Sequence, residues 1–150
     1  MITGRLLGID HGLKRIGLAV SDASGLVARE LSIIQRQSKV ADFATINRVA
    51  ADHGVVAMVV GIPGNDVANP GGYTQADTVR RWIERLADTT NLPIIQWDEQ
   101  LSSVDAQALA RTQRRKPQEP IDDLAARVIL QSYLDAVRDG LATPPPRSTI

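Results

Sequence analysis

The sequence predicts an α/β domain whose mixed five-stranded sheet is flanked by helices. Two apolar runs around a short polar break that contains glycine, within residues 6–22, predict an antiparallel hairpin at one edge. Further along, strand-like apolar runs alternate with segments of helical periodicity, which predicts parallel βα units. In sheets of this kind, ligands gather at the carboxyl ends of the strands.

The hairpin places a carboxylate, Asp10, where its first apolar run gives way to the turn. Paired strands hold a side chain rigidly, which suits a metal ligand or a catalytic group. The alternative is a turn aspartate that hydrogen-bonds its own backbone before a glycine. A third extended stretch follows at residues 26–34.

Two helix-and-strand pairs form the middle of the chain. Residues 41–53 carry apolar side chains three and four positions apart, which favours a helix, and Gly54 is a natural C-cap. Residues 55–60 are an unbroken apolar run, typical of a strand covered on both faces. Residues 74–86 return to helical spacing.

The last third predicts a further strand and two helices. The strand at residues 92–97 runs straight into two acidic residues, and Ser102 or Ser103 can cap the helix that follows. The final helix spans residues 121–137, where apolar side chains again follow helical spacing.

Composition indicates one domain, residues 1–140, with a disordered proline-containing tail at residues 141–150. The formal net charge is zero, so a nucleic-acid partner needs a local basic patch. The absence of cysteine excludes disulfides, cysteine-ligated zinc and thiol catalysis. No apolar run approaches the roughly 20 residues of a membrane span, so we expect a cytoplasmic protein with no membrane partner.

Acidic residues at the predicted strand and helix ends suggest a site for divalent metals. Two metals about 4 Å apart can clamp the attacking and leaving oxygens of a phosphodiester displacement, and magnesium prefers carboxylates and water. The candidates are Asp10, one of Asp98 and Glu99, and one of Asp122 and Asp123. Neighbours in a strand point to opposite faces, so only one of the first pair can serve. We favour Glu99, with Asp98 as second choice.

Helix geometry separates the two acids that head the final helix. At about 100° per residue, Asp122 lies beside Ala125 and Ala126 at the edge of the apolar stripe, where small side chains let a helix approach a sheet closely. Asp123 points toward Arg127, with which it can pair on a solvated face. We therefore expect Asp122 to be the ligand.

Four motifs resemble the YqgF/RuvX family of RNase-H-like nucleases, over the chain from Arg5 to about Leu134. They are GIDHGLKRIGLAVSD at residues 8–22, VVGIP at 59–63, DEQLSS at 98–103, and the helix that opens with Ile121-Asp122. The resemblance implies an RNase-H-like fold. Members are described as Holliday junction resolvases or as nucleases that mature pre-16S ribosomal RNA.

The family's metal-binding acids would fall on Asp10, Glu99 and Asp122, which are the residues that position had favoured. The resemblance implies hydrolysis of nucleic acid with Mg²⁺ or Mn²⁺, acting on structured RNA such as pre-16S rRNA or on branched DNA. A junction resolvase needs two active sites and hence a homodimer, whereas a trimming enzyme can act as a monomer. Two departures are Gln100, where the family usually has arginine, and the loop at residues 66–72.

Basic residues near the predicted site could contact phosphates. Lys14 lies in the first turn, and Arg114, Arg115 and Lys116 precede the final helix. The alternative is that this charge run is only a solvated face, and Arg15 can simply support the hairpin.

Two other functions compete with a nuclease. A non-catalytic nucleic-acid-binding or ribosome-assembly factor predicts salt-dependent binding without metal-dependent turnover. The Asp-x-Gly hairpin is also similar to the phosphate loop of actin-like and Hsp70-like ATPases. One domain of this size, however, leaves no second lobe to close over a nucleotide.

Overall fold

The computed structural model describes residues 2–64, 74–98, 111, 113–116 and 118–146. Its elements lie close to the predicted positions, and they are β1 (Arg5–His11), β2 (Arg15–Ser21), β3 (Ala28–Gln35), α1 (Lys39–Asp52), β4 (Val55–Ile62), α2 (Gln75–Ala87), β5 (Ile94–Asp98) and α4 (Asp122–Arg138). The helix predicted after Ser102 or Ser103 falls outside the described residues.

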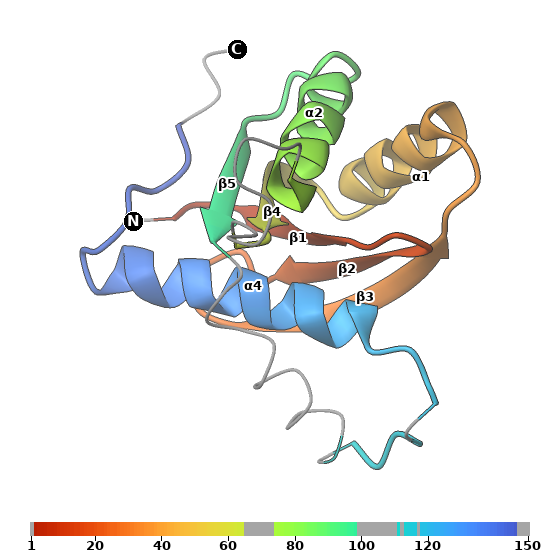
Figure 1. Ribbon diagram of the computed structural model, residues 1–150. Coiled ribbons are helices and arrows are strands. Elements are labelled where there is room, and N and C mark those ends of the chain that lie inside the picture. The colour runs from red at the N-terminus through yellow and green to blue at the C-terminus, as the bar shows by residue number, and fades with distance from the viewer. Residues whose placement is uncertain (1, 65–73, 99–110, 112, 117, 147–150) are drawn as a thin grey trace.

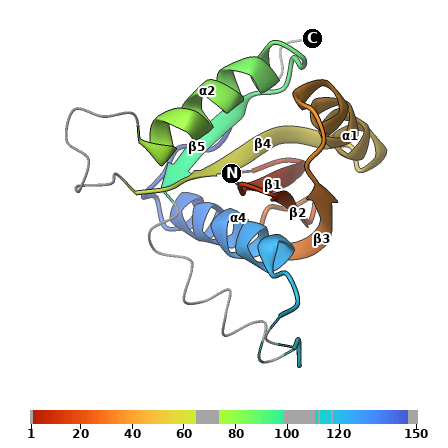
Figure 2. The same ribbon diagram turned by 45° about the vertical axis from the view of Figure 1, so that its right-hand side comes forward.

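The sheet is mixed and five-stranded, as predicted, with strand order β3-β2-β1-β4-β5. The strands β1, β2 and β3 pair antiparallel, while β4 and β5 run parallel to β1. Helices α1 and α2 cover one face and α4 covers the other (Figures 1 and 2). Within the described residues, no helix is long and apolar enough to span a membrane.

Side chains alternate between the two faces of the sheet along β1. Leu7 and Ile9 belong to the core beneath α1 and α2, whereas Leu6 belongs to the core beneath α4. Gly8 also faces α4, because a Cβ at this position would lie 2.8 Å from the Cβ of Leu130. Asp10, the next residue of this series, therefore faces α4 as well.

Glycines of the sheet bring the first turn of α4 into contact with the strands. A Cβ at Gly17 would lie 1.8 Å from the backbone oxygen of Asp122, so only glycine allows the helix to lie this close. We expected small side chains on the helix to permit the approach, and Ala126 is indeed buried. The missing side chains of Gly8 and Gly17 on the sheet contribute the decisive space.

The region after α4 continues along the body of the protein. The hydroxyl of Tyr133 donates to the carbonyl of Thr143 at 2.7 Å, and Ala142 packs against the core beneath α4. The predicted disordered tail thus includes described residues that contact the domain. Residues 147–150 lie outside the described part.

Candidate active site

Two of the predicted acids meet at the carboxyl end of β1. Asp10 lies directly opposite Gly17 in the antiparallel pairing of β1 and β2. The backbone of Asp122, at the start of α4, covers Gly17 on the face toward which Asp10 points. Residues from the two ends of the chain thereby share one corner of the sheet.

Arg15 holds the carboxylate of Asp122. Its Nε–H donates to Asp122 Oδ2 at 2.9 Å, which joins the first residue of β2 to the first residue of α4. On its other side, the Oδ1 oxygen lies 3.4 Å from where a Cβ of Gly12 would stand. From the sequence we expected Arg15 only to support the hairpin, because no local pattern links positions so far apart.

The chemistry of these donors fits a hard divalent cation. Mg²⁺ and Mn²⁺ bind carboxylates together with water, and ligating carboxylates are commonly oriented by a further hydrogen bond such as the one from Arg15. Among the described residues, Asp10 and Asp122 are predicted acids that both lie next to Gly17. Among the residues that the structure describes, no group of three or more potential metal ligands is found. Glu99, the predicted third ligand, lies outside them.

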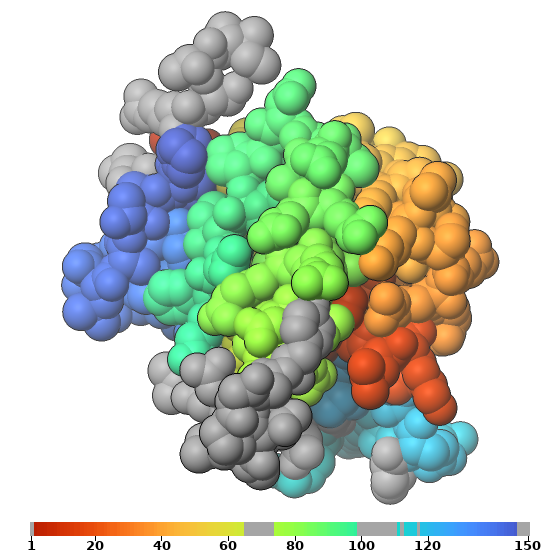
Figure 3. Space-filling model, turned by 45° about the horizontal axis from the view of Figure 1, so that its top comes forward, coloured from red at the N-terminus to blue at the C-terminus, as the bar shows by residue number. Residues whose placement is uncertain are grey.

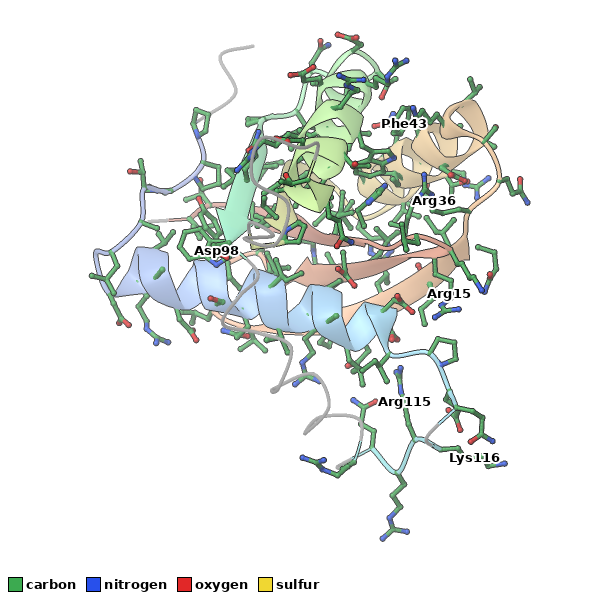
Figure 4. All side chains as sticks on the ribbon, viewed as in Figure 1. Arg15, Arg36, Phe43, Asp98, Arg115 and Lys116 are labelled. Atoms are coloured by element: carbon green, nitrogen blue, oxygen red, sulfur yellow. The ribbon has the colours of Figure 1, made fainter. Side chains whose placement is uncertain are left out.

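The end of β5 bears on the choice between Asp98 and Glu99. The indole N–H of Trp97 donates to Ser132 Oγ at 3.1 Å, and its ring meets Tyr133 edge-on at a centroid distance of 5.3 Å. Trp97 therefore faces α4. Asp98, which is labelled in Figure 4, pairs with Ile62 and comes next in the strand. It therefore belongs to the opposite face from Asp10.

The position of Asp123 in the structure contradicts one prediction. It is buried, with 8% of its surface exposed, and both its oxygens accept hydrogen bonds from Arg115 at 2.7 and 3.0 Å. The predicted pair with Arg127 on a solvated face is wrong, since Arg127 donates to Glu30 of β3 at 3.0 Å. Arg115, which precedes α4, reaches this side of the helix, a tertiary contact that helical periodicity does not reveal.

The predicted basic residues therefore differ in their surroundings. Hydrogen bonding to Asp123 raises the pKa of Arg115, whose side chain is only 18% exposed. Its guanidinium also donates to the carbonyl of Pro120 at 3.0 Å. Lys14, Arg114 and Lys116 are exposed. Figure 4 shows Arg115 directed toward α4 and Lys116 farther out.

His11 follows Asp10 but points to the other face of the sheet. Its ring packs against Trp82 at a centroid distance of 4.7 Å. Burial, aided by the positive charge of Arg36, lowers the pKa of His11 to about 4. The imidazole is consequently neutral near pH 7 and belongs to the core beneath α1 and α2, not to the pair of carboxylates.

Comparison with known proteins identifies the family to which this chain is similar. The family model described as "RuvX: Holliday junction resolvase" matches residues 4–136. A protein of Thermoanaerobacter pseudethanolicus named "Putative pre-16S rRNA nuclease" is 40% identical over 139 residues, covering 90% of this chain and 99% of that protein. A protein of the same name from Symbiobacterium thermophilum is 41% identical over 149 residues, covering 97% and 99%.

Solved structures show the same fold at low sequence identity. RuvC of T. thermophilus in complex with a Holliday junction substrate has a TM-score of 0.64 at 18% identity, covering 93% of this chain and 98% of that one. The Fowlpox virus resolvase in complex with Holliday junction DNA has a TM-score of 0.53 at 12% identity, covering 89% and 98%. The match over residues 4–136 and relatives of about 40% identity show that this chain belongs to the RuvX family.

Proposed function

We propose that this chain is a metal-dependent endonuclease that hydrolyses phosphodiester bonds in the 5′ region of pre-16S rRNA, in the cytoplasm. The observation that carries the proposal concerns Gly17: Asp10 lies opposite it in the sheet, and the backbone of Asp122 lies against it. Arg15 orients the carboxylate of Asp122. The names of the relatives in Thermoanaerobacter and Symbiobacterium support pre-16S rRNA as the substrate.

The residues have distinct roles in this proposal. Asp10 and Asp122 would hold the metal together with Glu99, which we retain from the family motif and prefer to Asp98. Bound Mg²⁺ or Mn²⁺ would supply activation of the attacking water and stabilisation of the leaving oxygen.

The protein itself supplies orientation and binding. Arg15 fixes the Oδ2 oxygen of Asp122, and the Oδ1 oxygen would bind the metal. The exposed cations Lys14, Arg114 and Lys116 would contact phosphates of the substrate. Arg115 was predicted to join them, but its ion pair with Asp123 favours a structural role.

A second candidate function is resolution of Holliday junctions. The description of the family model and the fold shared with RuvC favour it. Resolution requires two cuts and hence a homodimer, whereas processing of rRNA is compatible with a monomer.

A cleavage assay with both substrates tests the proposal. The purified chain is incubated with a 16S precursor RNA that keeps its 5′ extension, or with a four-way DNA junction, in Mg²⁺, Mn²⁺ or EDTA. We expect cleavage of the RNA at a defined position in either metal and none in EDTA. Cleavage of the junction alone would support the second function. Salt-sensitive binding of the RNA and the junction without any cleavage would contradict both candidate functions and indicate an assembly factor.

A further inference from the structure

The turn between β1 and β2 presents an apolar side chain next to the candidate site. This turn, residues 12–14, is called the hairpin tip below. Leu13 at its centre is 79% exposed, while its neighbour Gly12 lies against the Oδ1 oxygen of Asp122. A single exposed leucine is common on protein surfaces. Whether Leu13 has a function is therefore judged from the structure and surroundings of the tip.

Arg36 braces all the carbonyl groups of the hairpin tip. Its Nη1 donates to the carbonyl oxygens of Gly12 and Leu13 at 3.0 and 3.2 Å, and its backbone N–H donates to that of Lys14 at 3.0 Å. The turn is also closed by the N–H of Gly12, which donates to the carbonyl of Arg15 at 2.9 Å. A braced turn loses little conformational freedom when it binds a partner.

Three basic residues lie close to this leucine in the chain or in space, and one of them, Arg15, is paired with Asp122. Lys14 is exposed beside it, and Arg36 and Arg15 flank the tip. In the space-filling view the red turn lies at the surface between the orange segment after β3 and the cyan segment before α4 (Figure 3). The combination suits a polyanion whose phosphates meet the cations while an apolar base meets the leucine.

We propose that the hairpin tip is a nucleic-acid contact in which Leu13 packs against a base and Lys14 pairs with a neighbouring phosphate. The tip's place beside Asp122 puts that base close to the bond to be cut, and this last step rests on the proposed function. The contact itself requires only that the chain binds nucleic acid.

Leu141 provides a matched control. It is 81% exposed, as much as Leu13, but it follows the opposite end of α4. Removal of its side chain changes the apolar surface by the same amount at a distance from the site.

Binding measured across a salt series separates an apolar contact from an ionic one. The probe is a fluorescein-labelled RNA hairpin with a single-stranded 5′ extension, followed by anisotropy in EDTA. We expect Leu13→Ala to weaken binding about tenfold, or about 1.4 kcal/mol, at every salt concentration, because it removes the apolar side chain that the base would bury. The slope of log K against log [salt] stays that of the wild type. Lys14→Gln lowers this slope by about 1, and Leu141→Ala changes neither quantity.

A second readout reports on the base itself. The extension carries 2-aminopurine, whose fluorescence rises when it is separated from the neighbouring bases. We expect this rise when the wild type or the Leu13→Met variant packs a side chain against the base, and no rise with Leu13→Ala. The proposal is overturned if Leu13→Ala binds the RNA with the same affinity as Leu141→Ala. It is also overturned if these two variants give the same change in 2-aminopurine fluorescence.

These results are distinguishable from those that test the nuclease. A chain that shows the Leu13 effects but cleaves no substrate in Mg²⁺ refutes the proposed function and keeps the contact. Normal cleavage together with unaltered binding by Leu13→Ala refutes the contact alone.

Discussion

At the scale of single residues, the contact between Arg15 and Asp122 links the hairpin to the first residue of α4. The Nε–H to Oδ2 bond of 2.9 Å fixes one carboxylate oxygen and so restricts the orientation of the other. A guanidinium does this better than an ammonium, because its donors are arranged in a rigid plane. Arg15 thus acts on the candidate metal site through Asp122.

Replacement of Arg15 by glutamine tests this positioning role. We expect Mn²⁺, followed by electron paramagnetic resonance, to bind Arg15→Gln about tenfold more weakly than the wild type, as is typical for loss of a residue that orients a ligand. Arg15→Lys keeps the charge and should recover only part of the affinity. Tighter Mn²⁺ binding by Arg15→Gln would show instead that the ion pair competes with the metal.

Individual site residues were predictable to different degrees. Asp10 and Asp122 could be chosen because each follows from local pattern: a strand end before glycine, and the apolar edge of a helix. The partners of Asp122 and Asp123 could not be predicted from the sequence, since Arg15 and Arg115 reach these acids through tertiary contacts. Asp123 is buried and paired with Arg115, a contact that no periodicity predicts.

At the scale of elements, the packing of α4 on β2 determines where Asp122 lies. The helix has no side-chain cap at its N-terminus, and its first turn lies directly on Gly17. This glycine is required for space, because a side chain there would collide with backbone atoms.

Gly17→Ala should therefore impair both stability and cleavage. We expect a loss of about 3 kcal/mol in the free energy of unfolding, measured in urea, because overpacking against a backbone cannot be relieved by a rotamer change. Displacement of Asp122 should also reduce cleavage. Gly54→Ala is the control, since Gly54 has a positive φ of 64° but open space around it. It should cost only about 1 kcal/mol, and equal losses in the two variants would contradict the steric explanation.

The segment before α4 makes a second prediction at this scale. Arg115→Ala leaves the buried carboxylate of Asp123 without its partner and should cost about 3 kcal/mol of stability. The salt slope of RNA binding should remain unchanged, because this guanidinium is engaged by Asp123 and Pro120.

Lys116→Ala is the matched variant in the same segment. It should leave stability unchanged and lower the salt slope by about 1. If Arg115→Ala lowered the slope while urea unfolding stayed normal, Arg115 would be a phosphate contact after all.

At the scale of the whole molecule, the order of the elements along the chain predicted the mixed sheet and its helical layers. Strand and helix periodicity were sufficient because each element buries one regular face. The close approach of α4 was expected from alanines of the helix, but it depends on the glycines of the sheet. Sequence patterns of a single element do not show which residues of another element will oppose them.

The architecture brings the first strand and the start of the last described helix to one corner of the sheet. The antiparallel hairpin holds Asp10 in the central strand β1, opposite Gly17. Helix α4 runs across the sheet (Figure 1), and the backbone of its first residue, Asp122, lies against Gly17. The central claim is that this corner is a metal-dependent nuclease centre.

The most direct test is the rate of Mg²⁺-dependent cleavage of precursor RNA by Asp10→Asn. The control is Asp52→Asn. The tripeptide Asp-His-Gly occurs twice, at residues 10–12 and 52–54, but Asp52 is exposed at the end of α1. We predict that Asp10→Asn lowers the rate roughly a thousandfold, as expected when several kcal/mol of metal-dependent stabilisation are lost. Asp52→Asn should cleave at the rate of the wild type. A folded Asp10→Asn variant that cleaves as fast as the wild type would contradict the central claim.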